Sequence, residues 1–400
     1  MMELSLDTIR SAATAKGHRH GTDRLVPPRE TFERVRPHFA EIGLTRVANV
    51  TGLDVLGIPV VLSVRPNSRS LAVHQGKGLT LDAARASCVM ESLERWHAEN
   101  MTLPLRLGTP REMAQQGQVL DLDRHELFQS HDFRDRRLLW VEGRELTGGA
   151  RVWVPYNLVT MDFRCDGFDL LGHGTVPPWG NSNGLASGNH PMEALAHALC
   201  ELVERDTFIR DSMQPVAPRN TMDLATVDDP ACRQVLDVFL SAGLEVAVRD
   251  LTPDLGIPTF ECSIGEDPRT SHSPLPVNTG WGTHLRREIA LLRALTEAAQ
   301  TRLTFISGAR DDLPRNVYDS QRDKLRLTAK WNEMRKSSGT RAFHETPSHP
   351  HDTFEQDVLK IVDALRERGQ SQIVVVDLTK PHIEIPVMKV LVPGLLAPME

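Results

Sequence analysis

Three segments of the chain carry carboxylates at helical spacing, and the first of them contains Ser87, Glu91 and Glu94. These residues are four and three positions apart, so on a helix they share one face. Two ionised carboxylates one turn apart repel by about 1 kcal/mol in bulk water and by more near a protein surface. A divalent cation removes this repulsion, and oxygen ligands suit Mg²⁺, which commonly holds a nucleotide phosphate in its coordination shell.

The second segment repeats the pattern on a helix that is apolar nearly all round. Glu193, His197, Glu201 and Glu204 are spaced by four, four and three residues, and most residues between them are Ala, Leu, Cys or Val. A helix of this composition is normally buried. Its acidic stripe is therefore either buried at a high desolvation cost or lines a cleft.

The third segment reads Glu297-Ala-Ala-Gln300-Thr-Arg302 and ends in an arginine whose planar guanidinium suits a phosphate group. A single run of Glu-x-x-Glu-Arg is typical of a solvated helix surface. Two such runs, ending at Arg95 and Arg205, together with the third segment favour a metal–nucleotide site over that simpler interpretation.

Helices are predicted where these segments lie, over residues 81–99, 191–211 and 285–307, with Thr80 as the N-cap of the first. Gly76-Lys77-Gly78 is predicted to be a turn before the first helix.

Strands rich in Val and Leu alternate with helices along the whole chain, and no repeat or linker interrupts them. The predicted fold class is α/β in the mixed α+β sense, with mixed β-sheets packed against helices. We expect one lobed domain over residues 21–400, preceded by a weakly ordered N-terminus over residues 1–20.

The composition narrows the class of protein. The 400 residues carry a formal net charge of −7 and only 5% are aromatic, which argues against nucleic-acid binding. No run of about 18 apolar residues predicts a membrane span, and the N-terminus lacks the apolar stretch of a secretory signal. Five widely spaced cysteines without a CxxC pair favour a cytoplasmic protein over a disulfide framework or a structural zinc site.

Ser182 lies in Gly180-Asn-Ser182-Asn-Gly184, which matches the GxSxG nucleophile elbow of serine hydrolases. That elbow needs a strand directly before the serine and a helix directly after it. Here two prolines and a tryptophan precede the glycine, and the next helix is expected only near residue 191. A serine hydrolase remains an alternative of another class, with weak support.

Taken in order, these motifs resemble those of the YcaO superfamily. Ser87–Arg95 is similar to its SxxxExxER motif, the stretch from Ser182 to Arg205 to its second motif, and Glu297–Arg302 to its ExxQxR motif. The resemblance extends from about Gly21 to Gly394. It implies a YcaO fold that binds Mg-ATP in a cleft without a P-loop and uses ATP to phosphorylate the oxygen of a peptide backbone amide.

The resemblance also implies roles for individual residues. The expected magnesium ligands are Glu91, Glu94, Glu201, Glu204, Glu297 and Gln300. The expected nucleotide contacts are Arg24, Lys77, Ser87, Asn183, Glu193 and Arg302. Among these, Glu193 would take the ribose hydroxyls and Arg24 the γ-phosphate, while Lys77 could equally be a surface lysine. His197 occupies a variable position and is expected simply to pack, and no general base is identifiable.

One departure from the family and one similarity to a subgroup bear on the product. The C-terminal residues 393–400 lack the PxPxP tail of many azoline-forming members, and residues 47–54 and 66–78 are similar to members found with TfuA partners. Thioamide formation on a ribosomally made precursor peptide, with a TfuA-like or leader-recognition partner, is therefore the leading interpretation. Azoline-forming cyclodehydration, amidine formation and a non-catalytic nucleotide-binding scaffold remain alternatives, and the family suggests a homodimer.

Overall fold

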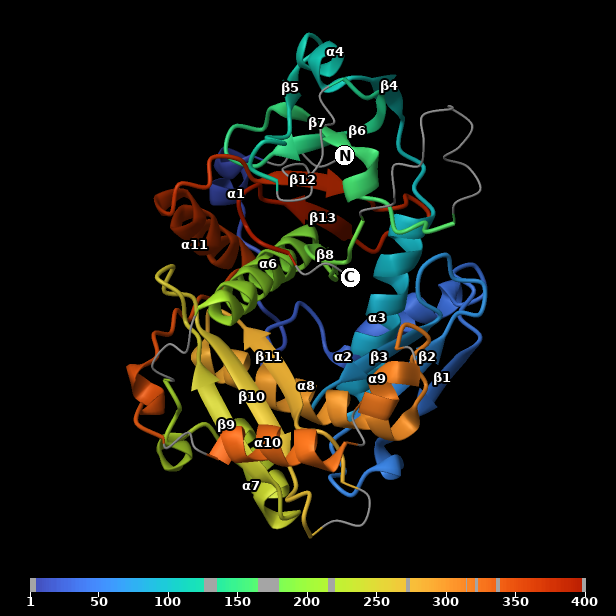
Figure 1. Cartoon of the computed structure of the whole chain (residues 1–400). Coiled ribbons are helices and arrows are strands. Elements are labelled where there is room, and N and C mark those ends of the chain that lie inside the picture. The colour runs from blue at the N-terminus through green and yellow to red at the C-terminus, as the bar shows by residue number, and fades with distance from the viewer. Residues whose placement is uncertain are drawn as a thin grey trace.

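The computed structural model describes residues 5–125, 135–164, 180–214, 220–270, 274–313, 315–320, 323–335 and 339–397. The strands in these ranges form three sheets (Figure 1). The first has the antiparallel order β1-β2-β3, from Arg46–Asn49, Val60–Val64 and Val73–Lys77. The second has the antiparallel order β11-β10-β9, from Asn278–Thr283, Thr259–Gly265 and Glu245–Asp250.

The third sheet has seven strands in the order β5-β7-β6-β12-β13-β8, with β4 paired to β6. Its strands are β4 Arg106–Gly108, β5 Gln118–Val119, β6 Leu138–Glu145, β7 Arg151–Pro155, β8 Leu185–Ser187, β12 Val374–Asp377 and β13 Val387–Leu391. The β5–β7 pair is parallel and the other pairs are antiparallel. The mixed α/β class predicted from the sequence is confirmed.

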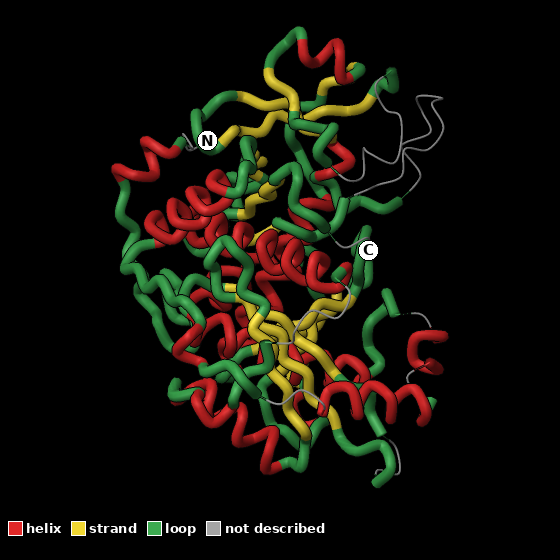
Figure 2. Tube along the Cα trace, turned by 60° about the vertical axis from the view of Figure 1, so that its left-hand side comes forward, coloured by secondary structure: helices red, strands yellow, loops and turns green. Residues whose placement is uncertain are grey.

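The described α-helices lie around these sheets. They are α1 Leu6–Ser11, α2 Pro28–Val35, α3 Leu81–Glu99, α4 Pro110–Ala114, α6 Pro191–Met213, α7 Pro230–Ser241, α8 Arg287–Ser307, α9 Arg315–Ser320, α10 Lys324–Arg335 and α11 Phe354–Glu367. Figure 2 shows helices on both sides of the strands in the lower half of the molecule. No helix in the described ranges combines the length and apolar character that a membrane span requires.

The three predicted carboxylate helices are α3, α6 and α8. Their observed bounds agree with the prediction to within two residues at each end. Thr80 caps α3 as predicted, its side chain accepting a hydrogen bond from the backbone of Ala83 at 3.1 Å. Helix α8 ends at Gly308, whose φ of 57° is the left-handed conformation that commonly terminates a helix.

Glycines set how closely two of these helices approach their strands. A Cβ at Gly76 would lie 2.2 Å from backbone atoms of Ala84 and Cys88 on α3. A Cβ at Gly280 in β11 would lie 2.2 Å from the backbone nitrogen of Ala298 on α8. The predicted turn at residues 76–78 is therefore wrong. Gly76 and Lys77 belong to strand β3, and the glycine is needed for helix contact rather than for a turn.

The N-terminus is more ordered than its polar composition suggests. Residues 5–20 are described and include α1, which buries Leu6 and Ile9. Thr14 then binds the buried carboxylate of Glu355 on α11 through its backbone nitrogen at 2.7 Å and its hydroxyl at 2.6 Å. The expectation of weak order over residues 1–20 is not met for residues 5–20.

Because His97 on α3 is buried, we expect the free energy of unfolding to fall on acidification. Its ring is fully buried, its Nδ1 donates to the Leu93 carbonyl at 2.8 Å, and its buried Nε2 has no hydrogen-bond partner. Burial lowers the pKa of His97 from 6.5 to about 4. Between these values the unfolded chain binds a proton that the folded protein does not bind, so this contribution to stability is lost as the pH falls.

The variant His97→Asn keeps a donor for the Leu93 carbonyl and cannot titrate in this range. Urea unfolding should show that wild-type protein loses about 2–3 kcal/mol more than the variant between about pH 7 and about pH 4, at roughly 1.4 kcal/mol per pKa unit. Parallel stability profiles for the two proteins would contradict the assignment to His97.

Candidate functional site

Helices α3, α6 and α8 lie in the centre of the molecule (Figure 1), and carboxylates on α3 and α8 contact neighbouring strands. Glu94 on α3 accepts hydrogen bonds from the backbone nitrogen and hydroxyl of Ser187 in β8, both at 2.7 Å. Lys77 at the end of β3 forms an ion pair with Glu297 on α8. The motifs were predicted to act together, and these contacts connect α3 to β8, the strand that precedes α6, and β3 to α8.

The exposure pattern decides between a buried stripe and a stripe that lines open space. On α6, Glu201 is half-buried while its neighbours in the sequence on both sides are buried. The side chains of Glu91 and Glu297 are 30% and 20% exposed on helices that are otherwise largely buried. Glu204, at 6% exposure, is the buried member of the set. The stripes therefore face a space that solvent reaches.

Three of these carboxylates resist ionisation in the metal-free protein. Burial raises the pKa of Glu94 to about 8, although the hydrogen bonds from Ser187 oppose the shift. Burial also raises the pKa of Glu201 to about 7, with Arg205 opposing. The pKa of Glu204 rises for the same reason, again against Arg205, and Glu297 adds to the rise. Several clustered oxygen donors with uncompensated negative charge fit a hard divalent cation such as Mg²⁺.

Two other carboxylates are already compensated by cations. Burial opposes ionisation of Glu91, but a side-chain contact with the buried His74 and the charges of Arg95 and Arg310 hold its pKa at about 2. The pKa of Glu297 is lowered, because Lys77 and Arg205 outweigh the effect of burial. Lys77 therefore contacts one of the predicted metal ligands directly, which places it at the site rather than on a remote surface.

The predicted ligands lie farther apart than direct coordination of one metal ion by three of them requires. In the described ranges, one group of three acidic, histidine or cysteine side chains has its ligand atoms within 4.8 Å of one another, and it consists of Asp23, His284 and Asp357. No three of the predicted carboxylates approach so closely. Gln300 is half-buried one turn after Glu297 on α8, as its spacing requires.

Arg24 and Glu193 lie together at one end of the site. Arg24 Nε is 3.7 Å from Glu193 Oε1, and the backbone nitrogen of Leu25 donates to Glu193 Oε2 at 2.8 Å. Glu193 is 3% exposed and also accepts a hydrogen bond from Asn189 at 3.3 Å. Because Arg24 lies against Glu193, the residue expected to take the ribose, a γ-phosphate contact requires the half-exposed Arg24 side chain to turn away from Glu193.

The other predicted nucleotide contacts are more dispersed. Ser87 is exposed on α3, one turn before Glu91. Asn183 is buried, and its side-chain oxygen has no hydrogen-bond partner. Arg302 does not point to the carboxylates of the site: its Nε lies 3.0 Å from Oδ2 of Asp54, which is 2% exposed.

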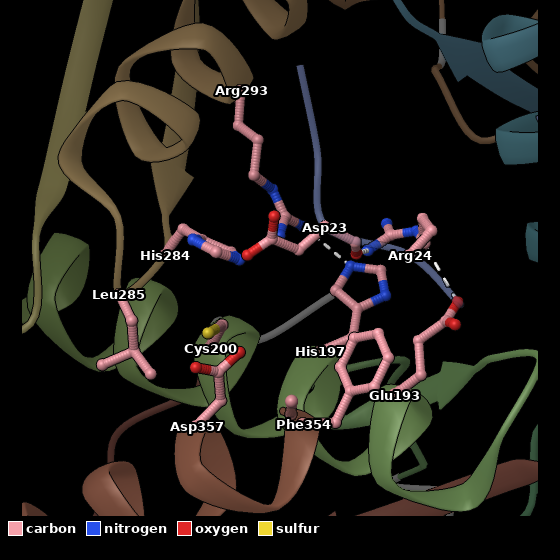
Figure 3. A pocket seen from close by; sticks show the side chains of 11 residues that line it. Asp23, Arg24, Glu193, His197, Cys200, His284, Leu285, Arg293, Phe354 and Asp357 are labelled. Carbon is pink, nitrogen blue, oxygen red and sulfur yellow. Dashed lines mark hydrogen bonds and ion pairs between the residues drawn. The ribbon is translucent and has the colours of Figure 1, made fainter. Parts of the chain in front are cut away.

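His197 and Arg293 are site residues that the sequence analysis did not select. Arg293 Nη2 donates to His197 Nε2 at 2.7 Å, and both line a small cavity beside Arg24 and Glu193 (Figure 3). Burial and the nearby Arg293 keep the pKa of His197 well below 6.5, so the ring is a neutral acceptor. Helical spacing could have indicated both residues. His197 lies four residues before Glu201, and Arg293 lies four residues before Glu297, so each shares a helix face with a predicted ligand.

Ser182 lacks the surroundings of a nucleophile elbow. A strand, β8, begins three residues after it at Leu185, where the elbow would need a helix, and α6 begins only at Pro191. The backbone oxygen of Ser182 accepts a hydrogen bond from the Leu185 nitrogen at 2.8 Å, which closes a turn into that strand. The prolines and tryptophan before Gly180 lie outside the described residues.

A protein-family model described as YcaO cyclodehydratase, ATP- and Mg²⁺-binding, matches residues 75–396, which include all three carboxylate helices. The chain belongs to the YcaO family. The ATP and Mg²⁺ named in the family description are the predicted cofactors, and the oxygen-rich donor set fits Mg²⁺. This YcaO protein is thus an ATP-dependent enzyme of the class that acts on peptide backbones.

Relatives of known sequence and structure agree with this membership. This YcaO protein is 36% identical, over 98% of its length and 92% of the relative's, to an uncharacterized protein in the tfuA 3′ region of Rhizobium leguminosarum bv. trifolii. It is 34% identical, over 93% of its length and 94% of the relative's, to an uncharacterized protein of Methanothermobacter thermautotrophicus.

Two solved structures share the fold. YcaO from Methanopyrus kandleri, bound with AMPPCP and Mg²⁺, has a TM-score of 0.74 at 24% identity and covers 96% of this chain and 94% of its own. A heterocyclase in complex with substrate and cofactor has a TM-score of 0.78 at 21% identity and covers 96% of this chain. This YcaO protein spans 54% of that heterocyclase chain.

Proposed function

We propose that this YcaO protein uses Mg-ATP to phosphorylate a backbone amide oxygen of a ribosomally made peptide and thereby forms a thioamide. The carboxylates on α3, α6 and α8, with the pKa values of Glu94 and Glu201 raised by burial, support the phosphorylation step because such donors suit Mg²⁺. The relative in the tfuA 3′ region supports the sulfur chemistry and a TfuA-like partner. A homodimer and a separate leader-recognition protein are further parts of the proposal.

The proposed roles of the side chains follow their charge. Glu91, Glu94, Glu201, Glu204, Glu297 and Gln300 would hold Mg²⁺, which neutralises phosphate charge. Lys77, half-buried against Glu297, would move to phosphate once the metal replaces it as the partner of Glu297. Phosphoryl transfer depends mainly on such positioning and charge neutralisation and needs little covalent help from the protein.

The proposed reaction balances without a redox partner. Sulfide adds to the carbonyl carbon, the resulting oxyanion attacks the γ-phosphorus of ATP, and ADP leaves. Phosphate then departs with the former amide oxygen, a proton is lost, and the C=S bond remains. In the azoline-forming alternative, which the cyclodehydratase family description favours, a side-chain thiol or hydroxyl of the peptide takes the place of sulfide.

Mass spectrometry of one reconstituted reaction tests the proposal. The protein is incubated with Mg-ATP, sulfide, a TfuA-like protein and a candidate peptide containing heavy oxygen in its backbone amides. Exchange of oxygen for sulfur, with heavy oxygen recovered in phosphate, is the expected result. Loss of water with the same transfer would indicate azoline formation, and ATP binding without transfer to phosphate would indicate a scaffold.

A further inference from the structure

The chain just before Arg24 folds into a small hairpin that nothing in the proposed mechanism uses. His18 and Arg24 exchange two backbone hydrogen bonds, of 2.8 Å from His18 N to Arg24 O and 2.9 Å from Arg24 N to His18 O. Gly21 turns the chain between them with a φ of 68°. The hairpin therefore fixes the backbone from which the Arg24 side chain extends.

A buried lysine closes this hairpin and ties it to α11. The ammonium of Lys16 lies 2.8 Å from Asp23 Oδ2 and 2.6 Å from Asp357 Oδ2, and all three side chains are at most 4% exposed. The backbone nitrogen of Lys16 also donates to the carbonyl of Asp352 at 3.1 Å. Asp23 is the residue next to Arg24, so Lys16 acts on the part of the hairpin that carries the arginine.

The same place contains the three-residue cluster whose geometry could accommodate a metal. Asp23, His284 and Asp357 have ligand atoms within 4.8 Å of one another. However, the Lys16 ammonium already contacts both aspartates at hydrogen-bond distance and compensates part of their charge. Arg286 adds a second cation 3.7 Å from the other oxygen of Asp23. Arg286 also pairs with Glu288 at 2.6 Å, so Lys16 is the cation that joins the two aspartates. These ion pairs make the cluster a salt-bridge clamp.

The clamp borders the proposed nucleotide site. Figure 3 shows Asp23 and Arg24 above α6, with His197 and Glu193 on one side and Asp357 on the other. The cavity between them measures about 20 Å³, room for about one water molecule. The clamp therefore lies on one side of the Arg24 backbone, while the Arg24 side chain lies 3.7 Å from Glu193.

We propose that Lys16 is a positioning residue for nucleotide binding: by holding Asp23 against Asp357 it fixes Arg24 in the site. This inference rests on the proposed contact of Arg24 with the nucleotide. Lys16 itself is too deeply buried to touch ATP, because its side chain is 1% exposed. Its effect on ATP must therefore pass through Arg24.

A double-mutant cycle tests this route. Calorimetry measures Mg-ATP affinity for Lys16→Met, Arg24→Gln and the protein with both changes. Because a hydrogen bond to a charged group contributes about 1.5–3 kcal/mol, each single change should weaken binding at least about tenfold. The double variant should bind no more than about twofold more weakly than Arg24→Gln, since the effect of Lys16 is lost with the arginine.

Loss of Lys16 alone leaves two buried aspartates with less compensation and can unfold the hairpin. The variant Lys16→Met/Asp357→Asn removes one charge of each sign, leaves Asp23 with Arg286, and should weaken ATP binding as much as Lys16→Met. A matched control, Thr14→Val, removes a side-chain hydrogen bond to α11 outside the hairpin and should bind ATP like wild type.

The outcomes separate the inference from the proposed function. If Arg24→Gln weakens binding but both Lys16 variants bind ATP normally, the inference alone is wrong. Fully additive losses, or a loss in the Lys16 variants with none in Arg24→Gln, would also overturn it, because Lys16 would then act by another route. If none of the variants changes the affinity, the proposed nucleotide contact of Arg24 fails with it.

Discussion

Glu204→Gln is expected to abolish Mg²⁺-dependent ATP binding and to leave the metal-free protein at least as stable as wild type. Glu204 is 6% exposed, and burial together with the charge of Glu297 raises its pKa. Ionisation of this side chain is therefore costly until a cation arrives. Glutamine keeps the shape and removes the charge, which should relieve the metal-free fold and deprive Mg²⁺ of a ligand.

The size of the effect on binding should be large. Removing groups that only support metal ligands typically costs 10–100-fold in affinity, so loss of a ligand should cost at least about 100-fold. Calorimetric titration with ATP, with and without Mg²⁺, measures this loss, and thermal unfolding without nucleotide measures the stability. The affinity for Mg-ATP should fall while the melting temperature without nucleotide stays the same or rises. Replacement of a carboxylate with only a structural role would lower the melting temperature.

Glu367→Gln on α11 is the matched control, because it makes the same chemical change at an exposed position of another helix. It should leave both the affinity and the melting temperature unchanged. Wild-type affinity in Glu204→Gln would remove this residue from the metal site. A marked loss of stability without nucleotide would show that Glu204 has a structural partner instead.

The helices that carry the site could be predicted because their signals are local. A 19-residue helix between Thr80 and Asn100 is specified by its cap and by its apolar positions. Strand β11 contains glycines at positions 280 and 282, which weaken the local signal for a strand. They are glycines because α8 lies against them, a reason that depends on a partner distant in sequence.

For the site, too, local spacing could be predicted from the sequence and long-range pairs could not. Helical spacing places Glu201 and Glu204 on one face, and the order of the motifs indicated which segments act together. The pairing of Glu94 with Ser187, and of Lys77 with Glu297, links residues 93 and 220 positions apart. No periodicity encodes such pairs, so they could come only from the folded structure.

The expected nucleotide contact of Arg302 also depends on partners that are distant in sequence. Replacement of Arg302 is expected to have a large effect on stability. The motif implies a nucleotide contact, whereas the structure pairs Arg302 with Asp54 at 3.0 Å and with Glu266 at 3.7 Å. The side chains of Arg302 and Asp54 are 9% and 2% exposed. Arg302→Met leaves a buried carboxylate unpaired and should destabilise the protein by about 3–5 kcal/mol.

The double variant Arg302→Met/Asp54→Asn separates stability from ligand binding. Removing both charges should restore most of the free energy of unfolding, because the stranded charge causes the loss. If Arg302 also contacts the nucleotide, the refolded double variant should still bind Mg-ATP at least about tenfold more weakly than wild type, as expected for one charged hydrogen bond. Urea unfolding and calorimetry on the same preparations make the comparison. Full recovery of ATP affinity would assign Arg302 to the anchoring of residues 51–57 beside α8, and the family motif would then carry a structural arginine at this position.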